Sequence, residues 1–206
     1  SLSSDAFVLQ VQCACPLGGI STSALAMTPV SVYNPVGENN DGLGYGGASL
    51  SADALTLVST SYRDDDKGTY SGSVLVWERT NRTSSFSMFS PVILTDPDGR
   101  PYDYLGQGGA SISLDGLIVV AAAHSNSFSY YGRGYILVWE RQTRSTSFAS
   151  VAPTGLRDRD GDDYDYLGYG GVTISLDGLN IVVGVHRDDY KGLDTGSIIV
   201  WTRSAR

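Results

Sequence analysis

A repeat of 62 residues runs through this chain and constrains its fold more than any other feature. Three tryptophans mark the repeat, because Trp77, Trp139 and Trp201 follow one another at this interval. Many other positions keep the same step without insertion or deletion, including three glycine pairs (46–47, 108–109 and 170–171) and three aspartates (Asp53, Asp115 and Asp177). A fixed period of this kind indicates one structural unit stacked on copies of itself. The 206-residue chain therefore holds three repeats, at about 24–85, 86–147 and 148–206.

Each repeat has the pattern of short β-strands. Residues 109–114 alternate small or polar with apolar side chains, which is the period of a half-buried strand. Residues 117–123 form a continuous apolar run that suits a strand buried on both faces, and residues 134–139 are rich in β-branched and aromatic side chains. A weaker fourth strand is expected over 148–153, matching 86–94 one repeat earlier, and the Asp-Gly pair at 115–116 suits a tight hairpin turn. The sequence predicts an all-β, β-propeller-like array of three four-stranded antiparallel blades with an extra N-terminal strand.

Residues 1–23 do not follow the repeat and form an N-terminal arm. Apolar side chains recur along the arm with period two, which predicts a strand with one apolar face formed by Phe7, Leu9, Val11 and Cys13. An unpaired apolar strand promotes aggregation. We therefore expect it to add to a sheet of a neighbouring molecule or to pair within its own chain. Cys13 and Cys15 are too close in sequence to bridge each other without strain, which leaves free thiols or bonds to another segment or chain.

The residues of the third repeat carry a family resemblance. The segment Y-L-G-Y-G-G-V-T-I-S-L-D-G-L-N-I-V-V-G (Tyr166 to Gly184), followed by G-S-I-I-V-W (Gly196 to Trp201), resembles the FG-GAP repeat. The resemblance recurs three times and covers roughly residues 24–206. It implies a β-propeller like those of integrin α-subunits and many bacterial and algal surface proteins. The chain differs in having Leu-Gly or Tyr-Gly for Phe-Gly, and three blades where the family usually has about seven.

The composition favours an extracellular protein. The net charge is −8 without any basic run, which argues against nucleic acid and anionic membranes as partners. No apolar stretch approaches the ~18 residues needed to span a bilayer. The chain begins with Ser and shows no signal peptide, so we expect a mature, processed product outside the cell or at its surface. Asn81 opens an Asn-Arg-Thr sequon in an expected loop and is a candidate glycosylation site.

Acidic turns before the first strand of a repeat are candidate metal sites. The candidate ligands are Asp158, Asp160, Asp162, Asp163 and Asp165 in the third repeat and Asp96, Asp98 and Asp103 in the second. Calcium takes about six to eight oxygen ligands, and alternating aspartates around a glycine supply several from one turn. FG-GAP propellers commonly bind calcium in loops of this composition, although their loop lies between the first two strands of a blade. The alternative is a solvated turn in which Asp and Gly act through turn chemistry.

Two further candidates are weaker. The loops between the second and third strands (63–68, 124–132 and 187–192) carry charged and aromatic residues that suit a sugar or protein partner, or are plain polar surface. His124 and His186 are one repeat apart, so they mark a repeat position and not a catalytic pair. No Cys-His pairing, G-x-S-x-G or H-E-x-x-H motif is present. The sequence therefore predicts no enzyme.

The blade count favours a structural role. Three blades make a tight ring, and residues 24–33 are a fourth-strand equivalent without a blade of their own. The third repeat stops after its third strand, so the two pieces are complementary, within one molecule or between neighbours. We expect a subunit of an extracellular fibre or surface assembly that polymerises through its N-terminal strand, since a head-to-tail contact that does not close makes a filament. The competing expectation is a calcium-dependent adhesion or carbohydrate-binding module.

Overall fold

The computed structural model describes residues 28–125 and 132–206. The chain divides into two compact units, Ser1–Ser31 and Val32–Arg206, and the second contains all of the described strands. The expected donor strand and its residues (Phe7, Leu9, Val11, Cys13 and Cys15) lie outside the described residues. Within the described ranges, no helix is long and apolar enough to cross a bilayer.

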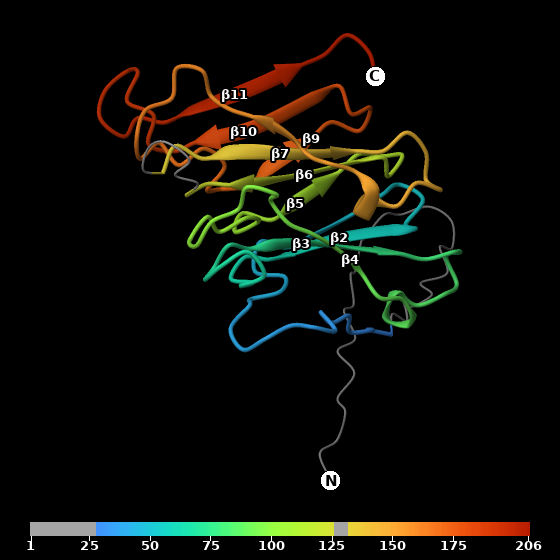
Figure 1. Cartoon of the computed structure of the whole chain (residues 1–206). Helices are drawn as coiled ribbons and strands as arrows, with labels where there is room; N and C mark the ends of the chain where they lie inside the picture. The colour runs from blue at the N-terminus through green and yellow to red at the C-terminus, as the bar shows by residue number, and fades with distance from the viewer. Residues whose placement is uncertain (1–27, 126–131) are drawn as a thin grey trace, which may run out of the picture. The chain divides into compact units, whose positions relative to one another are not determined.

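Val32–Arg206 folds into three antiparallel sheets, one for each repeat (Figure 1). Sheet 1 has the strand order β1 (Ala48–Leu50), β2 (Thr56–Ser61), β3 (Ser73–Glu78) and β4 (Val92–Leu94). Sheet 2 has the order β5 (Ala110–Ile112), β6 (Ile118–Ala123), β7 (Tyr135–Glu140) and β8 (Thr154–Leu156). Sheet 3 consists of β9 (Val172–Ile174), β10 (Asn180–Val185) and β11 (Ser197–Thr202). The all-β, antiparallel prediction is confirmed. Sheets 1 and 2 each take their fourth strand from the start of the following repeat, and sheet 3 has, within the described residues, three of the four strands expected for a blade.

The same hydrogen bonds close the turn between the first two strands of every sheet. In sheet 2, Ser113 Oγ donates to Asp115 Oδ1 at 2.7 Å, and the backbone N–H of Leu117 donates to the same oxygen at 3.1 Å. The contacts recur in sheets 1 and 3, at Ser51, Asp53 and Leu55 and at Ser175, Asp177 and Leu179. Short Ser and Asp side chains reach the backbone two residues on. The repeated S-x-D-x-L sequence therefore specifies this hairpin.

The fourth strand begins later than the sequence predicts. Phe148–Ser150 form a 3₁₀ turn (η2), which Ser147 caps by accepting the backbone N–H of Ala149. Pro153 follows, and because proline has a fixed φ and no N–H, pairing starts only beyond it. The prediction of a strand over 148–153 is wrong in its bounds, since the pairing strand is β8. The second repeat has the same arrangement, with η1 (Phe86–Met88) ahead of β4.

Glycine pairs bring the segments ahead of the first strands of neighbouring sheets into backbone contact. A β-carbon on Gly46 would lie 2.1 Å from the backbone nitrogen of Gly109, and one on Gly108 would lie 2.2 Å from that of Gly171. Only residues without a side chain permit this approach. The repeated Gly-Gly pairs therefore set how closely one sheet stacks on the next.

Sheet 2 lies between sheets 1 and 3 and is buried on both faces (Figure 1). Val119 and Trp139 belong to the core shared with sheet 1, whereas Ile118 and Ile136 belong to the core shared with sheet 3. Burial of one such side chain contributes about 1.5–3 kcal/mol. This two-sided burial explains the continuous apolar run over 117–123.

Sheet 3 has one covered face and one exposed face. The exposed face carries Ile198 and Val200, which are 72% and 55% exposed. One repeat earlier, Ile136 is fully buried and Val138 is half-buried, both in the core that sheet 3 covers. Among the described residues, no strand pairs with the outer edge of β11. Sheet 3 therefore combines an apolar face with a free strand edge.

Candidate functional site

The aspartates at the two ends of each acidic turn hold the backbone of that turn. Asp158 Oδ1 accepts the N–H of Asp160 at 3.1 Å, and Asp165 Oδ2 accepts the N–H of Asp162 at 2.6 Å. One repeat earlier, the same two positions accept the N–H groups of Asp98 and Arg100, through Asp96 and Asp103 respectively. These four carboxylates therefore act as turn formers, whichever further role the turns have.

The third-repeat turn also gathers negative charge. Desolvation raises the pKa of Asp165, and the like charges of Asp188, Asp162 and Asp158 add to this increase. Asp163 forms an ion pair with Arg133 at 3.0 Å. A group of carboxylates whose charges disfavour one another is relieved by a proton or by a bound cation.

The second-repeat turn is more enclosed. Asp96 is 4% exposed and accepts a hydrogen bond from the hydroxyl of Tyr135. Desolvation raises its pKa. Since Asp96 already faces a protein donor, it is a poorer candidate for a cation than the third-repeat carboxylates.

No group of three or more His, Cys, Asp or Glu side chains within residues 28–125 and 132–206 is arranged to hold a metal ion. In the third-repeat turn, Asp158 and Asp165 each give one oxygen to a backbone amide. Their second oxygens and the side chains of Asp160 and Asp162 are the candidate ligands. Calcium binding at this turn stays a prediction.

A row of aromatic side chains crosses the loops of all three repeats. Tyr104 stacks on His124 with ring centroids 5.7 Å apart, and Tyr166 stacks on His186 at 5.9 Å. His124 also lies 6.0 Å from Tyr166, and Tyr62 lies 6.3 Å from Tyr104, so the row is continuous. Ring pairs at about 4.5–7 Å attract one another beyond the effect of buried area. The row therefore ties the loops of neighbouring repeats together.

His124 is the buried centre of this aromatic row. It is 4% exposed, and its Nδ1 atom has no hydrogen-bond partner in the described part of the chain. Burial, followed by the charge of His186, lowers the pKa of His124 to about 4. The imidazole is therefore neutral at neutral pH, and it serves as an aromatic packing group.

Arginines flank the row. The guanidinium of Arg63 lies 4.9 Å from the ring centre of Tyr62, and that of Arg187 lies 5.2 Å from the ring of Tyr166. Tyr169 contacts both histidines and is 46% exposed. An exposed aromatic ring at the end of such a row is a surface on which a flat or sugar-like ligand can stack.

The histidines are recognisable from the sequence as repeat mates, whereas the tyrosines between them were not predicted as part of this row. Tyr104 and Tyr166 come from the Asp-Tyr-Leu-Gly motif at 103–106 and 165–168. Their φ angles are 53° and 52°, which few residues other than glycine adopt. The recurrence of Tyr in this motif was the available signal. Part of the middle loop, residues 126–131, lies outside the described ranges.

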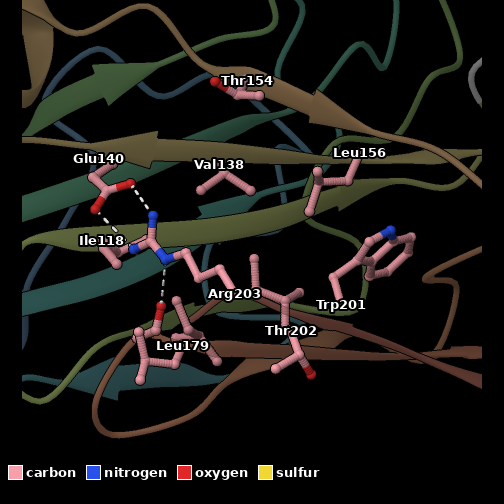
Figure 2. A pocket seen from close by; sticks show the side chains of 12 residues that line it. Ile118, Val138, Glu140, Thr154, Leu156, Leu179, Trp201, Thr202 and Arg203 are labelled. Atoms are coloured by element: carbon pink, nitrogen blue, oxygen red, sulfur yellow. Dashed lines mark hydrogen bonds and ion pairs between the residues drawn. The ribbon is translucent and has the colours of Figure 1, made fainter. Parts of the chain in front are cut away.

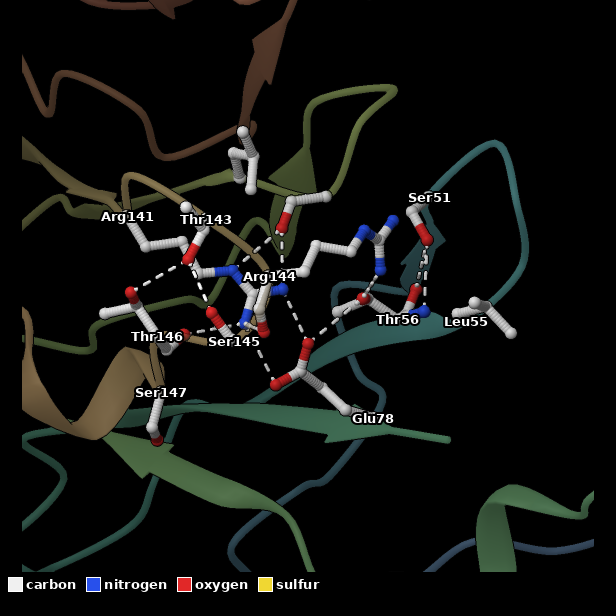
Figure 3. Close-up of polar contacts among 12 residues, drawn as sticks. Ser51, Leu55, Thr56, Glu78, Arg141, Thr143, Arg144, Ser145, Thr146 and Ser147 are labelled. Atoms are coloured by element: carbon white, nitrogen blue, oxygen red, sulfur yellow. Dashed lines mark hydrogen bonds and ion pairs between the residues drawn. The ribbon is translucent and has the colours of Figure 1, made fainter. Parts of the chain in front are cut away.

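A polar cluster joins sheet 1 to sheet 2 (Figure 3). The Arg141 side chain is fully buried, and it donates to Glu78 Oε1 at 2.6 Å and to Glu78 Oε2 at 3.0 Å. It also donates to the carbonyl oxygens of Gly116 and Thr146 and lies 4.3 Å from the ring of Phe148. Two-bond arginine–carboxylate pairs are among the strongest hydrogen-bonded contacts in proteins. This cluster therefore fixes the two sheets to each other.

The same chemistry recurs at the next junction. Arg203 donates to both carboxylate oxygens of Glu140, again with a sequence separation of 63. A second arginine per repeat pairs with the turn aspartate of the preceding sheet: Arg144 with Asp53 at 2.7 Å, and Arg206 with Asp115. Each junction between sheets is thus held by two ion pairs at constant sequence offsets.

A pocket of about 330 Å³ opens between sheets 2 and 3 (Figure 2). Its apolar lining includes Val138, Leu156 and Trp201, with the ion pair of Glu140 on one side. Between sheets 1 and 2, the same repeat positions belong to a core that includes the ring of Phe148. The pocket therefore lies at repeat positions that are packed in the core between sheets 1 and 2.

The candidate glycosylation residue lies on the surface. Asn81 is exposed in the turn after β3, and its Oδ1 accepts the N–H groups of Thr83 and Ser84 at 3.0 and 2.9 Å. These bonds orient an amide that is open to solvent. The loop placement that the sequence predicts is confirmed, and the modification stays a prediction.

No family model matches the chain, and no curated protein matches it. The function is therefore inferred from the geometry of the repeats.

Proposed function

We propose that the protein is a non-enzymatic extracellular structural protein, a subunit of a fibre or surface assembly that polymerises through its N-terminal strand. The observation that carries this proposal is the exposed face of sheet 3. Ile198 and Val200 are in solvent there, whereas their counterpart Ile136 in sheet 2 is fully covered by the next sheet. Contiguous exposed apolar surface next to a free strand edge marks an interaction site.

The repeat architecture supports this proposal. Three sheets stack through glycine contacts and paired ions that are the same at each junction. We take the arrangement as a propeller-like array of the FG-GAP kind, in which every blade needs a neighbour on each side. A contact between unlike surfaces of two copies that does not close produces a filament.

Electron microscopy of the full chain, with and without a calcium chelator, tests the proposal. Filaments that persist in chelator are the expected result. Deletion of residues 1–15 should leave a folded protein that does not polymerise. Discrete monomers or small rings at all concentrations would overturn the structural role, and assembly by the deleted form would overturn the arm mechanism.

A calcium-dependent adhesion or carbohydrate-binding module is the second candidate function. The aromatic row favours it, because Tyr169 is exposed beside His186 and the acidic third-repeat turn belongs to the same repeat. Glycan binding that is lost in chelator and restored by calcium would support this role. Glycan binding that is lost in the Tyr169→Ala variant and kept in the Tyr190→Ala variant would place the ligand on the row.

A further inference from the structure

We infer that the exposed side of sheet 3 is the docking site for sheet 1 of a second copy of this chain, with residues 30–32 of that copy added to β11 as its fourth strand. The inference rests on the proposed self-assembly, but it assigns the added strand to residues 30–32 and not to the arm, so a chain without residues 1–15 should still associate. Both surfaces are identified by comparison with the two junctions between sheets within one chain.

The acceptor surface has an empty strand position. In sheets 1 and 2 the fourth strand pairs with the third, Val74 with Leu94 and Ile136 with Leu156. Among the described residues, β11 has no such partner, although its sequence and register match those of β3 and β7. Its unpaired backbone groups are a template for an added strand.

The donor segment is the fourth-strand equivalent of the first repeat. Val30 and Val32 stand one repeat before Val92 and Leu94 of β4. In this structure residues 28–33 belong to no strand, and Val30 is 57% exposed. The repeat register places Val30 opposite Val200 of the other copy and Val32 opposite its Ile198, which buries exposed apolar side chains in pairs.

Val32, the last residue of the donor, already lies beside sheet 1. Val32 lines the same pocket as Trp77. One repeat later, Leu94 shares a core with Trp139 in the same relation. Val32 therefore has the same relation to sheet 1 that Leu94 of β4 has to sheet 2. In β4 this position belongs to a strand of the preceding sheet.

Sheet 1 also presents the arginines of a junction. Arg79 donates to the carbonyl oxygen of Ala54 at 2.8 Å and lies 4.5 Å from the ring of Phe86. Arg141 makes the matching two contacts while it binds the carboxylate of the preceding sheet. Arg79 is therefore pre-positioned for a sheet that lies before it.

The charges of the two surfaces are complementary. Arg82 donates to the carbonyl oxygen of Asp53 at 2.9 Å. One repeat later, Arg144 donates to the carbonyl oxygen of Asp115 and also forms an ion pair with Asp53, the turn aspartate of the preceding sheet. Asp177 accepts hydrogen bonds from Ser175 and from the N–H of Leu179, and the charge of Arg206 also acts on it. Arg82 of the docked copy and Asp177 would complete the third pair of this series.

One substitution weakens this junction relative to the two within the chain. Thr202 occupies the position of Glu78 and Glu140, so Arg79 of the second copy meets a hydroxyl in place of a carboxylate. Trp77 is already 2% exposed in the single chain, so docking would only replace the residues that cover this side chain. Both features predict a reversible contact, weaker than an internal junction.

The segment cannot reach β11 of its own chain. Val32 is beside Trp77 in sheet 1, and sheet 2 lies between sheet 1 and sheet 3. Stacked sheets are about 10 Å apart, so β11 lies about 20 Å away. Two residues span at most about 7 Å. Residues 30–32 can therefore pair with β11 only as part of a second copy.

Two aspartate variants of the full chain test the inference by sedimentation velocity across a concentration series. Val30→Asp alters the donor and Val200→Asp the acceptor. Both side chains are exposed in the single chain, so circular dichroism and thermal unfolding should show an unchanged fold. Each variant alone should associate at least about tenfold more weakly, because the added carboxylate loses its hydration in an apolar junction.

The mixture of the two variants gives the sharpest result. Val30→Asp keeps an intact acceptor and Val200→Asp an intact donor, so the mixture should form one-to-one heterodimers that do not grow further. Val36→Asp is the matched control, since the other repeats already carry Asp98 and Asp160 at this position. It should assemble like the unaltered chain.

Each other outcome identifies a different occupant and overturns the inference. Dimers of Val30→Asp alone would mean that two copies of sheet 3 face each other. A mixture that stays monomeric would mean that another segment covers β11. Undiminished assembly of both variants would overturn this docking site but leave the proposed self-assembly standing, whereas an unaltered chain that never associates would overturn both.

A gain of affinity supplies an independent test. Thr202→Glu restores the carboxylate for Arg79 and should tighten association about fivefold. The gain should vanish when Arg79→Gln is added. A Thr202→Glu chain that associates no better than the unaltered chain would contradict the placement of Arg79 at the junction.

Discussion

Arg141 binds Glu78 across the boundary between two repeats, through two hydrogen bonds of 3.0 and 2.6 Å, with its own side chain fully buried. The next junction repeats the contact between Arg203 and Glu140, but there the arginine side chain is 37% exposed. The same pair thus occurs in two solvent environments within one molecule. The difference allows the effect of burial to be measured.

Glu78→Gln should lower the free energy of unfolding by about 2–3 kcal/mol, because it leaves the buried guanidinium of Arg141 without its counter-charge. Glu140→Gln is the control and should cost less than about 1 kcal/mol, since water hydrates Arg203. Urea unfolding followed by tryptophan fluorescence measures both. Equal losses would show that burial does not govern these pairs.

Gly108→Ala should destabilise the stack by about 2–3 kcal/mol, because the new β-carbon would meet the backbone of Gly171 at 2.2 Å. Gly170→Ala is the matched control, since nothing lies within 4 Å of its added β-carbon. The control should stay within about 0.5 kcal/mol of the unaltered chain. Thermal unfolding of the two variants distinguishes backbone contact from a general cost of replacing glycine.

Stability should fall as the pH drops from about 6.5 to about 4, through His124. Burial lowers the folded-state pKa of this side chain from 6.5 to about 4, so in this window the unfolded chain binds a proton that the folded chain does not. The loss from this group approaches about 3 kcal/mol at the acid end. His124→Tyr, which copies Tyr62 of the first repeat, should remove this part of the pH dependence.

His186→Gln is the comparison variant. It removes the exposed imidazole whose charge adds to the lowering of the His124 pKa, and it should keep most of this pH dependence because burial is the larger cause. The raised pKa values of Asp96 and Asp165 act in the opposite direction, favouring the folded state as pH falls, and they are common to all three proteins. The difference between the unaltered chain and His124→Tyr therefore isolates the histidine. Parallel stability curves for these two proteins would contradict the role given to burial.

The pocket between sheets 2 and 3 should make Trp201 the accessible tryptophan. Trp201 is half-buried on the pocket wall, whereas Trp77 and Trp139 are 2% and 1% exposed. Trp201→Phe should remove most of the fluorescence that acrylamide quenches, and Trp139→Phe should leave it. Equal losses in both variants would show that the pocket is closed in solution.

The strands with local sequence signals were predictable, and those that depend on neighbours were less so. The second and third strands of each repeat follow from apolar runs such as 117–123, because two-sided burial leaves no polar positions. The fourth strand was misplaced over 148–153, because Phe148 is apolar for a different reason: it fills the space between two sheets ahead of the strand. Hydrophobicity alone does not separate these two roles.

The contacts between repeats could not be predicted from the sequence, for a geometric reason. Arg141 and Glu78 recur with the repeat, but only the stacking direction shows that each arginine faces the glutamate 63 residues earlier. The aromatic row has the same origin, since Tyr104 and His124 meet only because the turn before a sheet lies over the loop that follows. In the acidic turns, the end aspartates form the backbone hydrogen bonds that turn chemistry requires, and the metal-site prediction for these turns stays a prediction.

The constant offset between Arg141 and Glu78 has a consequence for how such chains change in evolution. A duplicated stretch of 62 residues, such as 79–140, carries an arginine at one end and a glutamate at the other. If this stretch is inserted in tandem after residue 140, its arginine takes the position of Arg141. Its glutamate then lies 63 residues before the arginine that follows in the next repeat, which is the offset between Glu78 and Arg141. Genes for this chain can therefore lengthen or shorten by whole repeats through unequal recombination, with every ion pair intact in the product and no compensating mutation.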